Sequence, residues 1–240
     1  WAWTWAGPVA AANSLWWFDS KFELPNPVPP PTMSDQYSLI PLPSRYDDHS
    51  PLNVEPFVRT LAGYFGTDAP GIAGTNVISM YQGIQRFLGD RGLGDQYSVT
   101  QVVSPTFEWV ADEVLRSEDV ILLLGFWQEQ YDEQQGKQVW KRIGGHYVTA
   151  AGVNKEAGLI AFSDPYDDNA EMVTGWGHVL PPHADHQDIT PTLHNDAAFV
   201  SHDVYQVVTT PSPGGRWGPE LYACRYMGYQ IYCNVTGFQN

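Results

Sequence analysis

Basic residues are scarce in this chain of 240 residues. Lysine and arginine together number 12, against 27 aspartates and glutamates, and the formal net charge is −15. A surface with this balance repels the phosphates of nucleic acids and of anionic membranes. We therefore expect no nucleic-acid partner.

Long apolar runs are missing as well. The longest candidate, residues 120–127, has the length of a strand and is too short to span a membrane. The first residues are tryptophans rather than a basic start followed by an apolar stretch, so we expect that any export signal has been removed. Gly-x-Ser-x-Gly, phosphate-loop and dinucleotide-binding motifs are also lacking, which leaves no competing chemistry of those kinds.

The overall composition is that of a folded globular protein. Hydrophobic residues make up 43% of the chain and aromatic residues 14%. Neither an internal repeat nor a convincing linker divides the sequence, so we predict a single domain over residues 1–240. Residues 25–56 contain nine prolines, which exclude a regular helix or a central strand and predict a long loop.

Hydrophobic periodicity predicts helices first and strands later. Helical spacing or capping residues indicate helices at 8–22, 54–65, 76–88 and 105–117. Alternating or short apolar segments indicate strands at 97–103, 119–127, 137–143, 146–153, 158–163, 170–176, 197–209 and 220–235. This order predicts an α+β fold in which an N-terminal helix packs on an antiparallel sheet.

The two cysteines flank a predicted hairpin. Placing Gly228 and Tyr229 in a two-residue loop puts Cys224 and Cys233 at a close, non-hydrogen-bonded pair, within disulfide range. We therefore predict a Cys224–Cys233 disulfide and, with it, an extracellular or cell-surface location. The alternative is a pair of small buried thiols.

The N-terminal segment predicts a helix that begins directly after residue 6. Trp1, Trp3 and Trp5 alternate with small residues like an extended strand, whereas Gly7 permits a sharp turn and Pro8 suits the first helical position. A side chain at such a junction lies beside unpaired N–H groups and the positive end of the helix dipole, which would favour a thiolate. Residue 6, however, is alanine.

A histidine and an aspartate follow at the ends of two predicted strands. Gly144, Gly145 and His146 precede an apolar strand, with His146 lying 140 residues after position 6. Asp164 follows 18 residues later, at the end of the next strand. Papain-like enzymes place their histidine about 130–150 residues after the catalytic cysteine.

Together these motifs resemble the papain-fold cysteine peptidases related to the bacteriocin-processing peptidases. The resemblance implies that His146 is the general base, that Asp164 orients it, and that Ala6 occupies the position of the nucleophilic cysteine. It also implies an oxyanion-hole glutamine about six residues before the nucleophile, upstream of Trp1, and a peptide or protein substrate. With Ala6 in place, the chain has no covalent mechanism. It is either an inactivated peptidase or a natural pseudopeptidase that binds peptides or serves in surface assembly.

Two acidic or histidine-bearing segments could suggest metal binding. Residues 177–188 hold three histidines, His178, His183 and His186, with Asp185 and Asp188, but they match no closed zinc pattern and include no thiolate. Asp164, Asp167, Asp168, Asn169 and Glu171 could offer oxygens to calcium, but the turn glycine of an EF-hand loop is missing. We therefore predict no metal and no cofactor, and assign Asp164 to His146.

Overall fold

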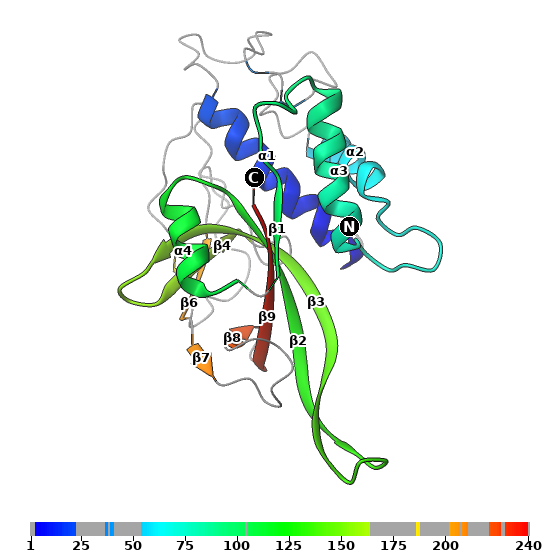
Figure 1. Ribbon diagram of the computed structural model, residues 1–240, viewed down its shortest axis with the longest axis vertical. Coiled ribbons are helices and arrows are strands. Elements are labelled where there is room, and N and C mark those ends of the chain that lie inside the picture. Colours follow the sequence, from blue (N-terminus) through cyan, green and yellow to red (C-terminus); the bar gives the residue numbers. More distant parts are fainter. Residues whose placement is uncertain are drawn as a thin grey trace, which may run out of the picture.

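The fold is given by a computed structural model of the chain. It describes residues 3–22, 37, 39, 40, 54–103, 105–163, 186–187, 202–206, 208–210, 221–226 and 229–239. Within these residues the architecture is α+β, with helices early in the chain and an antiparallel sheet later, as predicted (Figure 1). The prolines of residues 25–53, the predicted strand at 170–176 and most of the histidine-bearing segment lie outside the described residues.

The helices form where periodicity and caps predict them. A short 3-10 helix, η1 (Trp3–Trp5), leads into α1 (Ala6–Phe22), and α2 spans Val54–Phe65 as predicted. Helix α3 (Val77–Asp90) begins after Asn76, whose side chain accepts hydrogen bonds from the N–H groups of Ile78 and Ser79. Helix α4 (Phe107–Leu115) is capped in the same way by Thr106.

The strands form one sheet. Its order is β5-β6-β4-β3-β2-β9-β8-β7, with β1 paired beside β9, and all the described pairs are antiparallel. The bounds of the strands are β1 Thr100–Val102, β2 Val120–Asp132, β3 Lys137–Asn154, β4 Leu159–Ser163, β5 His186–Gln187, β6 His202–Gln206, β7 Val208–Thr210, β8 Leu221–Tyr226 and β9 Tyr229–Gln239.

Residues 120–124 of β2 and 147–150 of β3 pack into cores on both faces of the sheet. Ile121 and Tyr147 belong to a core shared with α1, α2 and α3. Leu122 and Val148, one position along each strand, belong to a second core with Val110 of α4. Side chains of a strand alternate between the two faces of the sheet. One face of these strands therefore packs on the first three helices and the other on α4.

Strand β3 is one continuous strand, where we predicted two. The sequence suggests a break at Gly144 and Gly145, but both residues pair with β2, opposite Phe126 and Gly125. The pairing shifts by one residue between Phe126 and Trp127, next to these glycines. Glycine within a strand often marks such a bulge rather than an end.

The register of the β8–β9 hairpin corrects the predicted cysteine pairing. Tyr226 pairs with Tyr229, so Cys224 lies opposite Ile231, and Cys233 lies opposite Tyr222. The predicted loop at Gly228 and Tyr229 is therefore wrong, and the two cysteines occupy diagonal rather than opposite positions of the hairpin. Diagonal Cα atoms are about 7–8 Å apart, beyond the usual disulfide range.

The disulfide itself stays a prediction, and a thiol count tests it. If Cys224 and Cys233 are bridged, the protein denatured without reductant will show no reactive thiol, and reduction will expose both. Two thiols before reduction would agree instead with the register of the β8–β9 hairpin. Because the loop between the cysteines is short, loss of the bridge should reduce stability only modestly.

Gly83 allows α2 and α3 to cross closely, which predicts a clear effect of substitution. A Cβ atom at Gly83 would lie 2.8 Å from the Tyr64 carbonyl oxygen and also collide with the Phe65 ring. We expect Gly83→Ala to lower the free energy of unfolding by about 1–3 kcal/mol, because it overpacks the crossing.

Gly63→Ala is the matched control. Gly63 lies in α2, and a Cβ there would meet no atom within 4 Å. This substitution should stabilise the protein by up to about 1 kcal/mol through helix propensity. Equal effects of the two substitutions in urea unfolding would contradict the described crossing.

Candidate functional site

The N-terminus of α1 is the position where the resemblance places a nucleophile. Ala6 is partly buried and packs against the core of the first three helices. The next residue, Gly7, is buried, and a Cβ there would lie 2.7 Å from the Thr75 hydroxyl oxygen. Glycine is therefore needed at this position because the 66–76 loop passes directly against it.

Residues 3–5, directly before Ala6, are helical, where the alternating tryptophans predicted a strand. Trp3–Trp5 form the turn η1, which runs straight into α1. A 3-10 turn is a common extension of a helix N-terminus, and spacing over so few residues does not separate it from a strand. The amide groups at the start of α1 thus continue a helical chain rather than follow a strand.

Asp68 ties this turn to the 66–76 loop. Its carboxylate accepts hydrogen bonds from the Thr4 hydroxyl at 2.7 Å, from the Trp5 indole N–H at 3.0 Å and from the Gly74 N–H at 2.8 Å. The hydrogen bond from Gly74, followed by that from Thr4, lowers the pKa of Asp68 below its usual value. The site therefore already holds a carboxylate near the positive end of the helix.

His146 lies on the other face of the sheet from α1. It pairs with Leu124, and alternation along β3 puts it on the same face as Val148, which packs in the core shared with α4. The neighbours on the α1 face are Tyr147 and Thr149. The Tyr147 hydroxyl donates to the Thr75 carbonyl at 3.1 Å, so Tyr147 is the β3 side chain that reaches the loop beside Gly7.

Asp164 lies outside the described residues, but Ser163 immediately before it is placed. Ser163 pairs with Thr149 across β3 and β4, and its hydroxyl accepts a hydrogen bond of 2.8 Å from the Asn13 side chain. Asn13 is seven residues beyond Ala6, which corresponds to about 10 Å along the helix axis. The end of β4 is thus fixed beside the middle of α1.

Further buried polar contacts join α1 to the sheet. The Thr149 hydroxyl donates to the Ala10 carbonyl at 2.8 Å, and the Ser14 hydroxyl donates to Asp119. Asp119 also accepts from the Val120 N–H at the start of β2. Buried polar groups need such partners, so these contacts fix how α1 lies on the strands. The sequence analysis missed them, although the polar pair Asn13 and Ser14 interrupts an apolar helix and was a usable signal.

The far end of α1 holds another polar cluster. Asp19 is fully buried and accepts a hydrogen bond from the Ile40 N–H at 3.0 Å. Nearby, the hydroxyl groups of Tyr37 and Tyr97 lie 2.5 Å apart. Burial, followed by the hydrogen bond with Tyr37, raises the pKa of Tyr97. These contacts join Ile40 to α1 and Tyr37 to Tyr97, which lies shortly before β1.

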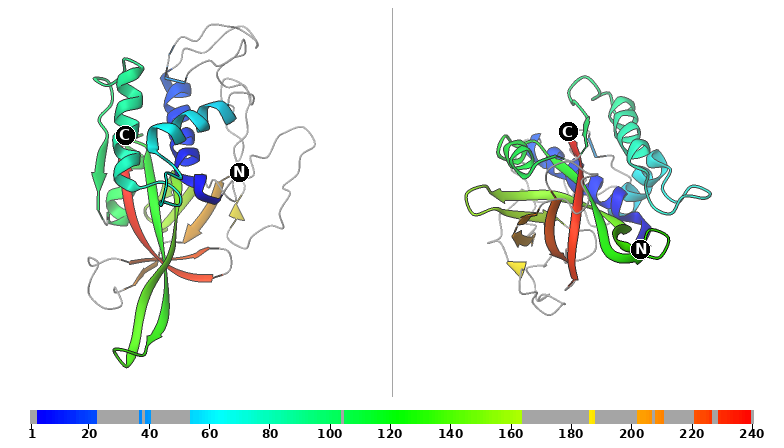
Figure 2. Two further views of the ribbon diagram at one scale, coloured as in Figure 1. Left: turned by 90° about the vertical axis from the view of Figure 1, so that its right-hand side faces the viewer. Right: turned by 60° about the horizontal axis from the view of Figure 1, so that its bottom comes forward.

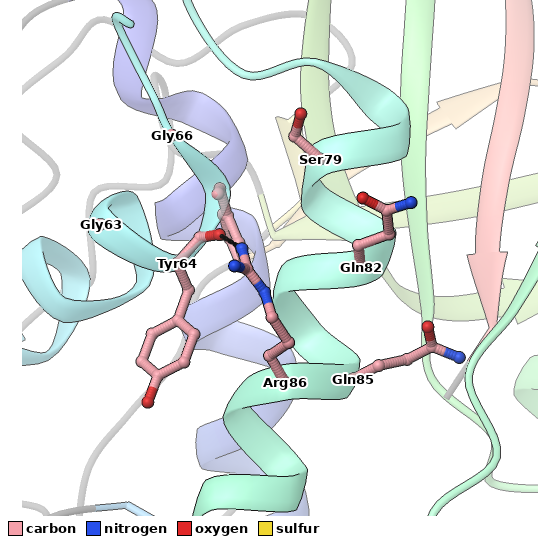
Figure 3. A pocket seen from close by; sticks show the side chains of 8 residues that line it. Gly63, Tyr64, Gly66, Ser79, Gln82, Gln85 and Arg86 are labelled. Atoms are coloured by element: carbon pink, nitrogen blue, oxygen red, sulfur yellow. Dashed lines mark hydrogen bonds between the residues drawn. The ribbon is translucent and has the colours of Figure 1, made fainter.

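A groove lies between the end of α2 and the outer face of α3 (Figure 3). The Arg86 guanidinium crosses it and donates to the Tyr64 carbonyl at 2.5 Å, while the Tyr64 hydroxyl donates to Asp90 at 2.7 Å. Neither Ala6 nor His146 contributes to this groove, which is lined by Gly63, Tyr64, Phe65, Gly66, Ser79, Gln82, Gln85 and Arg86.

The described part of the chain offers neither a metal site nor a membrane-spanning helix. It holds no group of three or more histidine, cysteine, aspartate or glutamate side chains arranged to bind a metal ion. Its helices include none that is both long and apolar enough to cross a membrane. Of the two segments considered above for metal binding, only the backbone of His186 and Gln187 is described. The other residues of both segments lie outside the described residues.

Comparisons with protein-family models, with curated proteins and with solved structures found no match. Any function assigned to this chain therefore has to come from its own residues.

The hydrogen bonds of Asp68 predict a pH-dependent contribution to stability. Because the folded-state pKa of Asp68 is lowered, this contribution is fully present above the unfolded-state pKa of about 3.9 and is lost as the pH falls through the folded-state value. Asp68→Asn should therefore lower the midpoint of thermal unfolding at pH 6–7, and the gap from the parent should close toward pH 2–3.

Asp95→Asn, at an exposed carboxylate in the turn after α3, serves as the control and should show a smaller effect. A gap between the parent and Asp68→Asn that stays constant over this pH range would contradict the ionised role of Asp68.

Proposed function

We propose that this chain is a papain-like, cysteine-peptidase-type domain without hydrolytic activity, and that it acts as a pseudopeptidase in extracellular peptide binding or surface assembly. The architecture supports the papain-like part of the proposal. A helix begins at the nucleophile position and lies on an antiparallel sheet, with helices preceding strands in the chain. The Thr149–Ala10 contact holds that helix on β3, which contains His146. The Asn13–Ser163 contact holds it on β4, which ends directly before Asp164.

The proposed lack of hydrolytic activity rests mainly on the position of His146 relative to α1. Cysteine-dependent hydrolysis requires a thiolate and a base within hydrogen-bond reach of each other. Ala6 supplies no ionisable group, and the alternation of β3 directs His146 to the face shared with Leu124 and Val148. This favours a pseudopeptidase over an enzyme that lacks only its nucleophile, because a cysteine at residue 6 would not have His146 beside it as a base.

The surroundings of Ala6 support the same choice. Thr4, Trp5 and Gly74 are engaged by Asp68, and Gly7 is in contact with Thr75. The start of α1 is therefore used to hold the 66–76 loop. A negative charge already bound there would also disfavour a second anion, such as a thiolate, at the adjacent position.

Thiol chemistry of Ala6→Cys tests the proposal directly. The helix terminus favours a thiolate at residue 6 and the Asp68 carboxylate disfavours it, so the reactivity of the introduced thiol alone does not test the role of His146. The decisive comparison is with Ala6→Cys/His146→Asn. We expect the pH profiles of alkylation by iodoacetamide to give thiol pKa values that differ by less than about half a unit between the two variants.

The parent protein, which retains Cys224 and Cys233, is the blank for alkylation. A mixed peptide library should remain uncut by the parent and by both variants. A thiol pKa that rises by one or more units on His146→Asn, or peptide cleavage by Ala6→Cys that His146→Asn abolishes, would establish a thiolate–imidazole pair and overturn the pseudopeptidase proposal.

A further inference from the structure

The groove between α2 and α3 is open to solvent, and all of its lining residues belong to the described part of the chain. Gly63 and Gly66 form part of its wall, and a Cβ atom at either position would meet no atom within 4 Å. The groove has a volume of about 590 Å³, within the range of small-ligand sites. Helices α2 and α3 lie together at one end of the molecule, with the turn between β2 and β3 at the other (Figure 2, left). A ligand can therefore enter the groove from solvent.

Arg86 gives the groove its charge. The other lining residues are uncharged at neutral pH, although the chain has 27 acidic residues against 12 basic ones. Within the described part of the chain, the Arg86 guanidinium donates to the Tyr64 carbonyl and forms no ion pair. The Asp90 carboxylate accepts from the Tyr64 hydroxyl instead. A guanidinium presents several N–H donors in a fixed fork, so donors of Arg86 remain for the carboxylate of a ligand.

Two polar side chains continue from Arg86 along α3. Gln82 and Ser79 precede Arg86 at a spacing of three to four residues, which puts all three on one side of the helix (Figure 3). The Gln82 amide is exposed and has no hydrogen-bond partner among the described residues. Gln85, which also lines the groove, donates to the Tyr81 hydroxyl at 3.0 Å. An amide side chain offers both a donor and an acceptor, which is the combination that a peptide group needs.

The distance from Ser79 to Arg86 suits a short extended peptide. The helix rises about 10 Å between these two residues, and three residues of extended chain span about the same length. A peptide whose terminal carboxylate pairs with Arg86 therefore brings its last peptide groups beside Gln82 and Ser79. The three side chains supply partners for both parts of such a ligand.

We infer that the groove between α2 and α3 binds the C-terminal end of an extended peptide. Arg86 pairs with the terminal carboxylate, while Gln82 and Ser79 hydrogen-bond to the backbone of the last residues. Because these contacts go to groups that every peptide has, the site accepts many sequences. Binding is weak because the groove is open and Arg86 is exposed. Neither Ala6 nor His146 lines the groove, so the inference does not depend on the proposed function.

An NMR titration of the ¹⁵N-labelled protein tests the inference. The probe is N-acetylated tri-alanine with a free carboxylate, added to about 20 mM, because a site of this kind binds in the millimolar range. The Arg86 Nε–H signal and the Gln82 side-chain amide signals should shift and saturate. The same peptide with an amidated C-terminus should bind at least about tenfold more weakly, because it cannot form the charge-assisted pair with Arg86.

Substitutions locate the site. Arg86→Gln should raise the dissociation constant of the probe at least about fivefold. Arg59→Gln is the matched control, since it makes the same change of charge at an arginine that pairs with Glu55 and does not line the groove. It should leave the constant unchanged. Gln82→Ala should raise the constant about threefold. This variant breaks no described contact, so it decides the outcome even if Arg86→Gln disturbs the α2–α3 crossing.

Circular dichroism confirms that each variant is folded. The absence of saturable shifts at Arg86 and Gln82, equal binding of the amidated peptide, equal effects of Arg59→Gln and Arg86→Gln, or binding indifferent to Gln82→Ala would each overturn the inference. Glucuronate, a carboxylate without a peptide group, should bind more weakly than the probe. Glucuronate that binds as tightly as tri-alanine would identify a site for sugar acids or for carboxylates in general, and would overturn the assignment of a peptide.

Discussion

The seating of α1 on the central strands is the constraint on which the rest of the structure depends. The helix is held by hydrogen bonds from Thr149 to the Ala10 carbonyl and from Asn13 to Ser163, both at 2.8 Å. The Ser14–Asp119 contact fixes the same helix to the start of β2. Polar groups buried between a helix and a sheet must find partners in one arrangement, so they determine the position of the helix more narrowly than apolar packing alone does.

The position of α1 on the strands determines which side chains lie near the start of the helix. Once Thr149 faces α1, the alternation of β3 puts Tyr147 on the same side and His146 on the opposite side. Tyr147 then reaches the Thr75 carbonyl, in the loop that contacts Gly7 and that Asp68 ties to Thr4 and Trp5. The N-terminus of α1 is thus a structural junction. Residues around Ala6, rather than Ala6 and His146 themselves, join the helix, the loop and the sheet there.

Local features of the fold were predictable from the sequence, whereas long-range register was not. The bounds of α2 match the prediction because a clear apolar stripe and a tolerated Pro56 in the first turn define the helix. Asn76 identifies the start of α3 through its side-chain cap. The face on which His146 lies depends instead on how β2 and β3 align. The partner of Cys224 depends on the register of the β8–β9 hairpin, which places it opposite Ile231, two residues from the predicted partner Cys233. Such choices follow from tertiary packing. Asp68 was missed because its role depends on contact with residues more than sixty positions away.

The central claim is that His146 and Ala6 lie on opposite faces of the sheet. Nuclear Overhauser contacts of the His146 ring protons, in protein with selectively labelled methyl groups, measure this most directly. The account predicts contacts from the His146 ring to the methyl groups of Leu124, its cross-strand neighbour, and none to the Ala6 methyl. Contacts from the His146 ring to the Ala6 methyl, without contacts to Leu124, would contradict the account and restore the catalytic pairing that the sequence suggests.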